Sequence, residues 1–212
     1  MATNLTVTGD ALISGDLRLS GSVTPLKDRD DVLALAELQV YAIPMSVWRV
    51  HDDYHSFLPN AGAADDLGLI GGTFGTDAPS LQTSDFGANG GAEDFEARAE
   101  VALPAEYVAG QTVKIRVHAG MLTAIADAAC TVDVEVYSSD KDATASGDLC
   151  ETPAAANNMN SLVFDDIDFV ITSGSLSPGD ILDVKLKVTA NDAATAVTVG
   201  CIGAVQLLCD VR

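Results

Sequence analysis

The clearest pattern in this chain is an alternation of apolar and polar residues that recurs through most of its length after residue 40. Side chains of a β-strand point to opposite faces in turn, so a strand buried on one side alternates with a period of two. Strong alternation covers residues 95–103, 113–117, 132–136, 182–188 and 205–211, and weaker runs cover 41–50, 67–74 and 161–171 and open at Val197. About eight to ten half-buried strands predict an all-β fold, an antiparallel β-sandwich with a jelly-roll-like topology.

Turn-forming residues separate these runs. The sequence Pro178-Gly179-Asp180 precedes a predicted strand, as is typical of a tight turn. Residues 138–160 are mostly small and polar, and they predict a long exposed loop of the kind that often contacts partners. Residues 60–94 combine many glycines with few strong strand formers, so we expect this stretch to be irregular.

A different pattern opens the chain, where residues 5–23 read LTVTGD ALISGD LRLSGS V. Each six-residue unit has two apolar residues at i and i+2, which face one side of an extended segment, followed by a Ser/Thr-Gly-Asp/Ser turn. Three such units cannot bury their apolar side alone. We therefore expect residues 1–25 to form a β arm or stalk that assembles with copies of itself, as a homotrimer. The alternative is a hairpin arm that folds back on the body. The residues expected at these contacts are Leu5, Val7, Gly9, Ile13, Gly15, Leu17, Leu19, Gly21 and Val23.

Residues 26–39 predict a short helical connector between this arm and the body of residues 40–212. Aspartates near the start of the segment can cap and charge-stabilise a helix N-terminus. Val32, Leu35 and Leu38 then fall on one helical face. The chain is thus expected to have three parts: arm, connector and β-sandwich.

Charge changes this picture by excluding classes of partner. The 212 residues include 31 acidic and only 11 basic side chains, which gives a net charge of −20. Nucleic acid and anionic membranes both need basic residues, so neither is an expected partner. No apolar run is long enough to span a membrane, and the start of the chain lacks an export signal, so we expect a soluble protein made in a cytosol. The acidity itself is typical of a solvated surface suited to high salt.

Candidate chemistry is sparse. His51 and His55 flank acidic residues at i and i+4, but a zinc protease needs this spacing on a helix with Glu in the second position. Here the segment follows a strand-like run, so a polar loop is the expected structure. Aspartates at 65–66 and at 165, 166 and 168 offer oxygen ligands for calcium, yet acidic turns are commoner than metal sites. We expect no catalytic residue, no cofactor and no metal.

The four cysteines also favour a structural role. Cys130, Cys150, Cys201 and Cys209 contain no CxxC pair, so a zinc ribbon or a redox motif is not indicated. Three of them lie in strand-like runs, where a thiol usually acts as a small core hydrophobe.

The repeat and the body together resemble proteins of tailed-bacteriophage virions. The strings NLTVTGD, LISGDL and LRLSGSV are similar to the short β-repeats that open trimeric phage fibres and some head-decorating proteins. The body, in particular LPAEYVAGQTVKIRVHAGM and LSPGDILDVKLKV, is similar to phage structural proteins. The resemblance implies a capsid decoration, or cement, protein. It would be made in the host bacterial cytoplasm and sit as a trimer on the outer surface of the icosahedral shell, where it would join neighbouring major capsid proteins.

Two other functions stay open. A capsid-fibre or tail-fibre receptor-binding module would contact host surface glycans, and it predicts an exposed aromatic or metal-ligand site at the distal tip. An enzyme such as a depolymerase would need catalytic residues, and the sequence offers no convincing set.

Overall fold

The computed structural model describes residues 38–85, 92–123, 130–139, 141–153, 159, 161–191 and 198–211. The arm of residues 1–25 and nearly all of the connector lie outside these residues, so the predicted contact positions stay predictions. The described elements are β1 (Gln39–Ala42), the 3-10 turn η1 (Met45–Val47), β2 (Gly68–Ile70), β3 (Ser80–Gln82), β4 (Ala92–Ala102), β5 (Val113–Met121), β6 (Cys130–Ser139), β7 (Asp165–Ile171), β8 (Ile181–Asn191) and β9 (Gly200–Cys209).

The strongly alternating runs form the long strands. In β8, Leu182, Val184, Leu186 and Val188 are fully buried, and the charged residues between them lie on the outer face. The same alternation buries every second residue through most of β5 and β6. Burial of one face therefore explains these strands, as the sequence predicts.

The weaker runs are less faithful to the prediction. A strand over 41–50 is wrong beyond Ala42, because the chain turns at Pro44 into η1. Proline lacks the N–H that a ladder needs, and this segment crosses between the two sheets. The run at 67–74 supplies only the short β2, and β3 forms within the stretch of 60–94 that was expected to be irregular.

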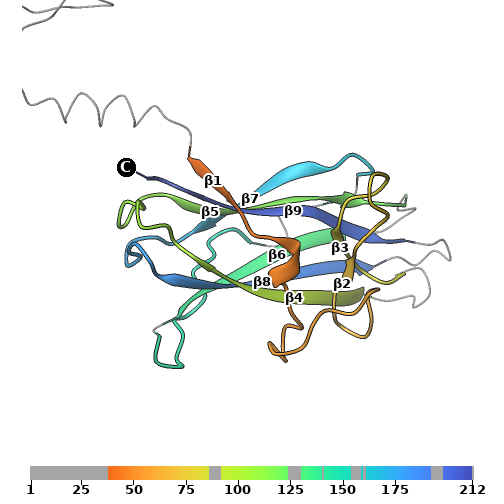
Figure 1. Ribbon diagram of the computed structural model, residues 1–212, viewed down its shortest axis with the longest axis horizontal. Coiled ribbons are helices and arrows are strands. Elements are labelled where there is room, and N and C mark those ends of the chain that lie inside the picture. Colours follow the sequence, from red (N-terminus) through yellow and green to blue (C-terminus); the bar gives the residue numbers. More distant parts are fainter. Residues whose placement is uncertain are drawn as a thin grey trace, which may run out of the picture. The chain divides into compact units, whose positions relative to one another are not determined.

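The strands form two antiparallel sheets, which face each other as two layers in Figure 1. The first sheet has the order β2-β3-β9-β5-β7, with β1 also paired to β9, and the second has the order β4-β8-β6. Partners are nested along the chain: β3 pairs with β9, β4 with β8 and β5 with β7. A long antiparallel hairpin rolled around a core gives this nesting, which is the jelly roll. The predicted fold class is confirmed.

Residues 145–150 complete the nested pattern at the edge of the second sheet. The N–H of Leu149 donates to the carbonyl of Val136 in β6 at 2.7 Å. Cys150 then bridges Ile171 of β7 in the first sheet. Part of the predicted polar loop thus lies along the edges of both sheets and closes one side of the sandwich.

The other side is closed by residues 43–49. The N–H of Ile43 donates to the carbonyl of Val205 in β9 at 2.9 Å. Six residues later, Arg49 exchanges two backbone hydrogen bonds with Arg98 of β4, at 2.8 and 3.0 Å. Strand edges offer free N–H and C=O groups to other chains, so these crossing segments protect β4, β6 and β7 from unwanted pairing.

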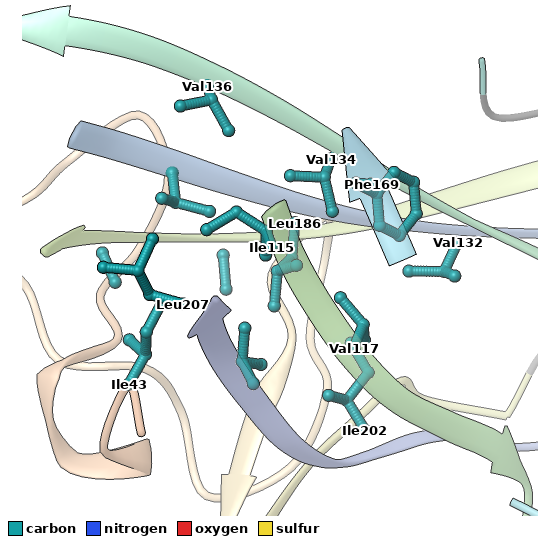
Figure 2. Close-up of a cluster of buried hydrophobic side chains, with 14 of the residues drawn as sticks. Ile43, Ile115, Val117, Val132, Val134, Val136, Phe169, Leu186, Ile202 and Leu207 are labelled. Atoms are coloured by element: carbon teal, nitrogen blue, oxygen red, sulfur yellow. The ribbon is translucent and has the colours of Figure 1, made fainter. Parts of the chain in front are cut away.

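The core lies between the two layers, where side chains of both sheets pack face to face (Figure 2). The largest fully buried side chains include Trp48, Phe95 and Phe169. Cys130, Cys201 and Cys209 are also buried, as predicted for small core hydrophobes.

No helix among the described residues is long and apolar enough to cross a membrane.

Candidate functional site

Polar chemistry in the described residues is concentrated on the outer faces of the two sheets. On the second sheet, alternation places charged residues of β4, β6 and β8 side by side. The strand register puts Arg98 directly opposite Lys185, and Glu100 directly opposite Asp183. Like charges opposite each other destabilise a sheet. The Arg98 guanidinium instead forms a two-point contact with the diagonal Asp183, in which Nε donates to Oδ1 at 2.6 Å.

Lys185 is the centre of the same face. Its Nζ lies 2.7 Å from Glu135 Oε1 on β6 and 3.3 Å from Glu96 Oε1 on β4. Burial alone would raise the pKa of Glu135, but hydrogen bonds from Lys185 and from the Tyr137 hydroxyl outweigh it and lower that pKa. Lys185 is therefore neutralised by two carboxylates, and none of these three side chains is left without an opposite charge.

The outer face of β5 and β7 is paired in the same manner. Arg116 Nε donates to Asp168 Oδ1 at 2.6 Å, and Lys114 Nζ donates to Asp168 Oδ2 at 3.2 Å. Asp166 accepts from His118 Nδ1 at 2.8 Å. Asp166 and Asp168, two of the three aspartates considered for calcium at this position, are thus held by basic side chains, which argues against a cation between them.

A third polar group, which we call the His51 cluster, consists of His51, Asp52, Asp66 and Glu96. His51 follows the segment that bridges β4 through Arg49, and Asp66 bridges Glu96 of β4 directly. The Glu96 N–H donates to the carbonyl of Asp65, with 2.7 Å between nitrogen and oxygen, and the Leu67 N–H donates to the carbonyl of Glu96 at 2.9 Å. Two loops are therefore tied to one strand, and this brings the four side chains together.

The geometry of the cluster is asymmetric around the imidazole. His51 Nε2 lies 2.9 Å from Glu96 Oε2, whereas His51 Nδ1 lies 3.6 Å from Asp66 Oδ1. The His51 and Asp66 side chains are only 17% and 19% exposed. Burial and the nearby Asp65 raise the pKa of Asp66, against the opposing effect of His51. One ligand atom each from His51, Asp52 and Asp66 lie within 4.8 Å of one another.

The two histidines considered from sequence do not meet. His55 is largely exposed and contacts Asp53, while His51 turns toward Asp66 and Glu96. The segment forms a loop, as predicted. The true partners of His51 lie 15 and 45 residues away, and no spacing in the sequence connects them. One signal in the sequence concerned Glu96: its polar position in an alternating strand predicts that its carboxylate lies on the outer face of the sheet, where loops can contact it.

An apolar hollow of about 610 Å³ lies beside the crossing segment. Met45, Leu69, Ala78 and Pro79 contribute to its lining, and no aromatic ring is among the described residues that line it. Stacking on a sugar ring needs such a side chain.

Phe57 and Phe74 are the exposed phenylalanines among the described residues, and neither lines this hollow. The Phe57 side chain is 77% exposed with the Arg49 guanidinium 4.5 Å from its centre, and the Phe74 side chain is fully exposed.

No protein-family model and no curated protein matches this chain. It is similar in backbone to several solved carbohydrate-binding modules. TmCBM61 in complex with β-1,4-galactotriose is 14% identical over 78% of this chain and 90% of its own, with a TM-score of 0.40. The CBM22-1 xylan-binding domain of Paenibacillus barcinonensis Xyn10C is 11% identical over 83% and 97%, with a TM-score of 0.40.

The xylan-binding module CBM15 is 11% identical over 82% of this chain and 99% of its own, with a TM-score of 0.44. Likeness at this level assigns no ligand or activity to the present chain. Its jelly roll is defined by its own strand pairing.

Proposed function

We propose that this chain is a structural protein of a tailed-bacteriophage virion that decorates the outer surface of the capsid. The hexad repeat of residues 5–23 carries the proposal, because three units in register have an apolar side too short to bury itself, and assembly with further chains would bury it. In this view residues 5–23 form a trimeric stalk that contacts the major capsid protein, and the sandwich is displayed outside the shell.

The charge of the chain supports an outer position. A net charge of −20 would be repelled by packaged DNA, whereas an outer surface exposes it to solvent and counterions. A trimer of this kind would also match the local threefold positions of an icosahedral shell.

The construction of the body supports the assignment of contacts to the repeat. The edges of β4, β6 and β7 are covered by crossing segments, and on the outer face of each sheet basic side chains form ion pairs with acidic neighbours of the same face. Strand addition at these edges would first have to displace a segment of the same chain. Attachment is therefore better served by residues 5–23 than by the sandwich.

The proposed mechanism is stabilisation by binding. A partner that binds the mature shell but not its disassembled subunits stabilises the shell by mass action, by about 2.7 kcal/mol per site at a hundredfold excess over Kd. Decoration would then raise the temperature or force at which capsids rupture. No catalytic step is required of the chain.

Light scattering on the full chain and on a chain lacking residues 2–23 tests this proposal. We expect a trimer that becomes a folded monomer on truncation. Ile13→Asp should also break the trimer, because Ile13 is in an apolar column, whereas Ser14→Asp adds the same charge beside it and should not. A trimer that survives truncation, or a full chain that is monomeric, would overturn the stalk.

Co-sedimentation tests the capsid contact separately. Capsids of a phage that encodes the chain, stripped of decoration, should bind the full chain and should not bind the chain lacking residues 2–23. If the truncated chain saturates the capsids as well as the full chain does, the repeat is not the anchor.

A second candidate function is contact with host surface glycans through the sandwich. The exposed rings of Phe57 and Phe74 favour it, because an exposed aromatic face is the usual platform for a sugar ring. Binding of host polysaccharide that is lost in Phe57→Ala or Phe74→Ala, but kept in a control at the exposed Leu162, would support this function. Turnover of the polysaccharide would instead indicate an enzyme.

A further inference from the structure

We propose that the His51 cluster binds a divalent transition metal of the zinc type, with His51 Nδ1, Asp66 and Asp52 as the protein ligands. The inference concerns the sandwich alone and does not depend on the virion proposal. It differs from the protease-like arrangement considered in the sequence, because His55 takes no part.

Two buried atoms in the cluster point to a missing partner. His51 Nδ1 and Asp66 Oδ1 are both inaccessible to solvent and have no hydrogen-bond partner. They lie 3.6 Å apart, which is too far for a hydrogen bond between them. A buried polar atom without a hydrogen-bond partner destabilises the fold, so two such atoms that face each other are best explained by a ligand bound between them.

The separation suits a metal ion. Zinc bonds to histidine nitrogen and carboxylate oxygen are roughly 2.0–2.2 Å long, and in a tetrahedral site two such ligand atoms are about 3.3–3.6 Å apart. The observed 3.6 Å between Nδ1 and Oδ1 falls at the upper end of that range. Asp52 is exposed and within 4.8 Å, so it can supply a third ligand from the solvent side.

The other imidazole nitrogen is already held as a metal site requires. Histidine ligands commonly donate their second ring N–H to a carboxylate, which fixes the tautomer and leaves the first nitrogen free to bind the metal. Glu96 Oε2 occupies this position, 2.9 Å from His51 Nε2. Glu96 is in turn oriented by Lys185, whose Nζ lies 3.3 Å from Glu96 Oε1, so the supporting carboxylate is held by an ion pair on the outer face of the sheet.

The ligand set selects the class of metal. One imidazole and two carboxylates suit zinc and neighbouring transition metals, whereas calcium prefers six to eight oxygen ligands and magnesium keeps most of its water. Three protein ligands leave a fourth position for water or an external ligand. Bound metal would also tie the loop of residues 50–56 to the loop at Asp66, which raises the stability of the metal-bound protein.

The competing explanation is that His51 serves only as an ion-pair partner of Asp66 and Glu96. This arrangement needs no metal. The two explanations differ in a zinc titration, because ion pairing alone provides no saturable site for zinc.

The test uses the full chain, freed of metal with a chelator, and calorimetric titration with zinc at about pH 7.5. We expect saturable binding of a single ion per chain. Asp52→Asn should weaken it by about 10-fold or more without disturbing the buried groups, and Asp66→Asn and His51→Gln should abolish it. The control His55→Ala should bind as tightly as the original chain, since the His55 side chain is exposed and forms its ion pair with Asp53, outside the cluster.

Cobalt absorption identifies the ligands independently. Nitrogen and oxygen ligands give visible d–d bands without the strong near-ultraviolet bands of thiolate, so the spectrum separates this cluster from the cysteines. Absence of saturable zinc binding, binding that is unchanged in Asp66→Asn, or a thiolate spectrum would each overturn the proposal.

Discussion

Arg98 and Lys185 lie directly opposite each other across β4 and β8, yet the Arg98 guanidinium contacts Asp183, a diagonal neighbour. Arg98 and Lys185 therefore each pair with acidic side chains on neighbouring strands and not with each other. Asp183 is only 14% exposed, so its carboxylate is largely withdrawn from water and depends on Arg98 for its hydrogen bonds.

Asp183→Asn should destabilise the sandwich. It removes a charge-assisted two-point contact and leaves the Arg98 guanidinium without its principal partner, at a cost of about 1–3 kcal/mol. Urea unfolding followed by the single tryptophan measures the change. Lys141→Ala is the control, because its pair with Asp180 is long, at 3.5 Å, and Lys141 is 53% exposed, so its loss should cost less than about 0.5 kcal/mol. If both substitutions lowered the free energy of unfolding equally, the contact between Arg98 and Asp183 would not stabilise the sandwich more than an exposed ion pair does.

Asp168 makes stability depend on acid. Hydrogen bonds from Arg116 and then Lys114 lower the pKa of Asp168 in the folded state, although burial opposes them. A carboxyl whose pKa is lower in the folded than in the unfolded chain stabilises the fold above its unfolded value, near 3.9, and this contribution disappears as pH falls through the folded value.

Asp168→Asn should therefore be destabilising near neutral pH and progressively less so below about pH 4. Urea unfolding at a series of pH values checks this, with Asp165→Asn, at the exposed start of β7, as the control. A difference between Asp168→Asn and the original chain that stays constant down to pH 2 would show that the lost charge is not the cause.

Gly120→Ala should disturb the first sheet. A Cβ at this position would lie 2.9 Å from the Phe164 ring, closer than real contacts allow, and 3.2 Å from the Phe164 backbone, tighter than most real contacts. Overpacking of this kind costs about 1–3 kcal/mol. Thermal unfolding measures it against Gly147→Ala, where no atom lies within 4 Å of the new Cβ. Gly120→Ala with no loss of stability would mean that the strand moves freely away from Phe164.

The cysteines should resist modification while the protein is folded. Burial raises the pKa of the Cys130 thiol to about 12 and those of Cys150 and Cys209 to about 11, and it also raises the pKa of Cys201. Only the thiolate reacts quickly, so labelling at pH 8 should be slow for all four thiols until denaturant is added. We expect the half-buried Cys150 to react first. Rapid labelling of Cys130 in the native state would contradict its burial.

The sequence allowed the long strands to be predicted, because the signal for them is local. Alternation in β5, β6 and β8 follows from burying one face of a strand, and each strand shows it without reference to its partners. The segment around Pro44 was mispredicted because its apolar residues are buried by a crossing between sheets, which does not follow a period of two.

The candidate site was beyond sequence reasoning. His51 was examined with His55, its neighbour at i+4, but its contacts are Asp66 and Glu96. These partners meet because two loops bond to the edge of β4, and backbone hydrogen bonds to a distant strand leave no periodic trace in the side chains.

The sequence by itself determined that the body is a sandwich of half-buried strands and that the protein is acidic, because the first follows from alternation within short runs and the second from the count of charged residues. The tertiary structure decided which charges neutralise one another, since the partners Arg98 and Asp183 are 85 residues apart. It also decided that Asp166 and Asp168 form ion pairs with His118 and Arg116. Asp66 Oδ1 instead faces His51 Nδ1, and neither of these two atoms has a hydrogen-bond partner. The physical reason is that ionic and ligand chemistry depends on distances of a few ångströms, and in a jelly roll those distances are set by strand register across the nested hairpin.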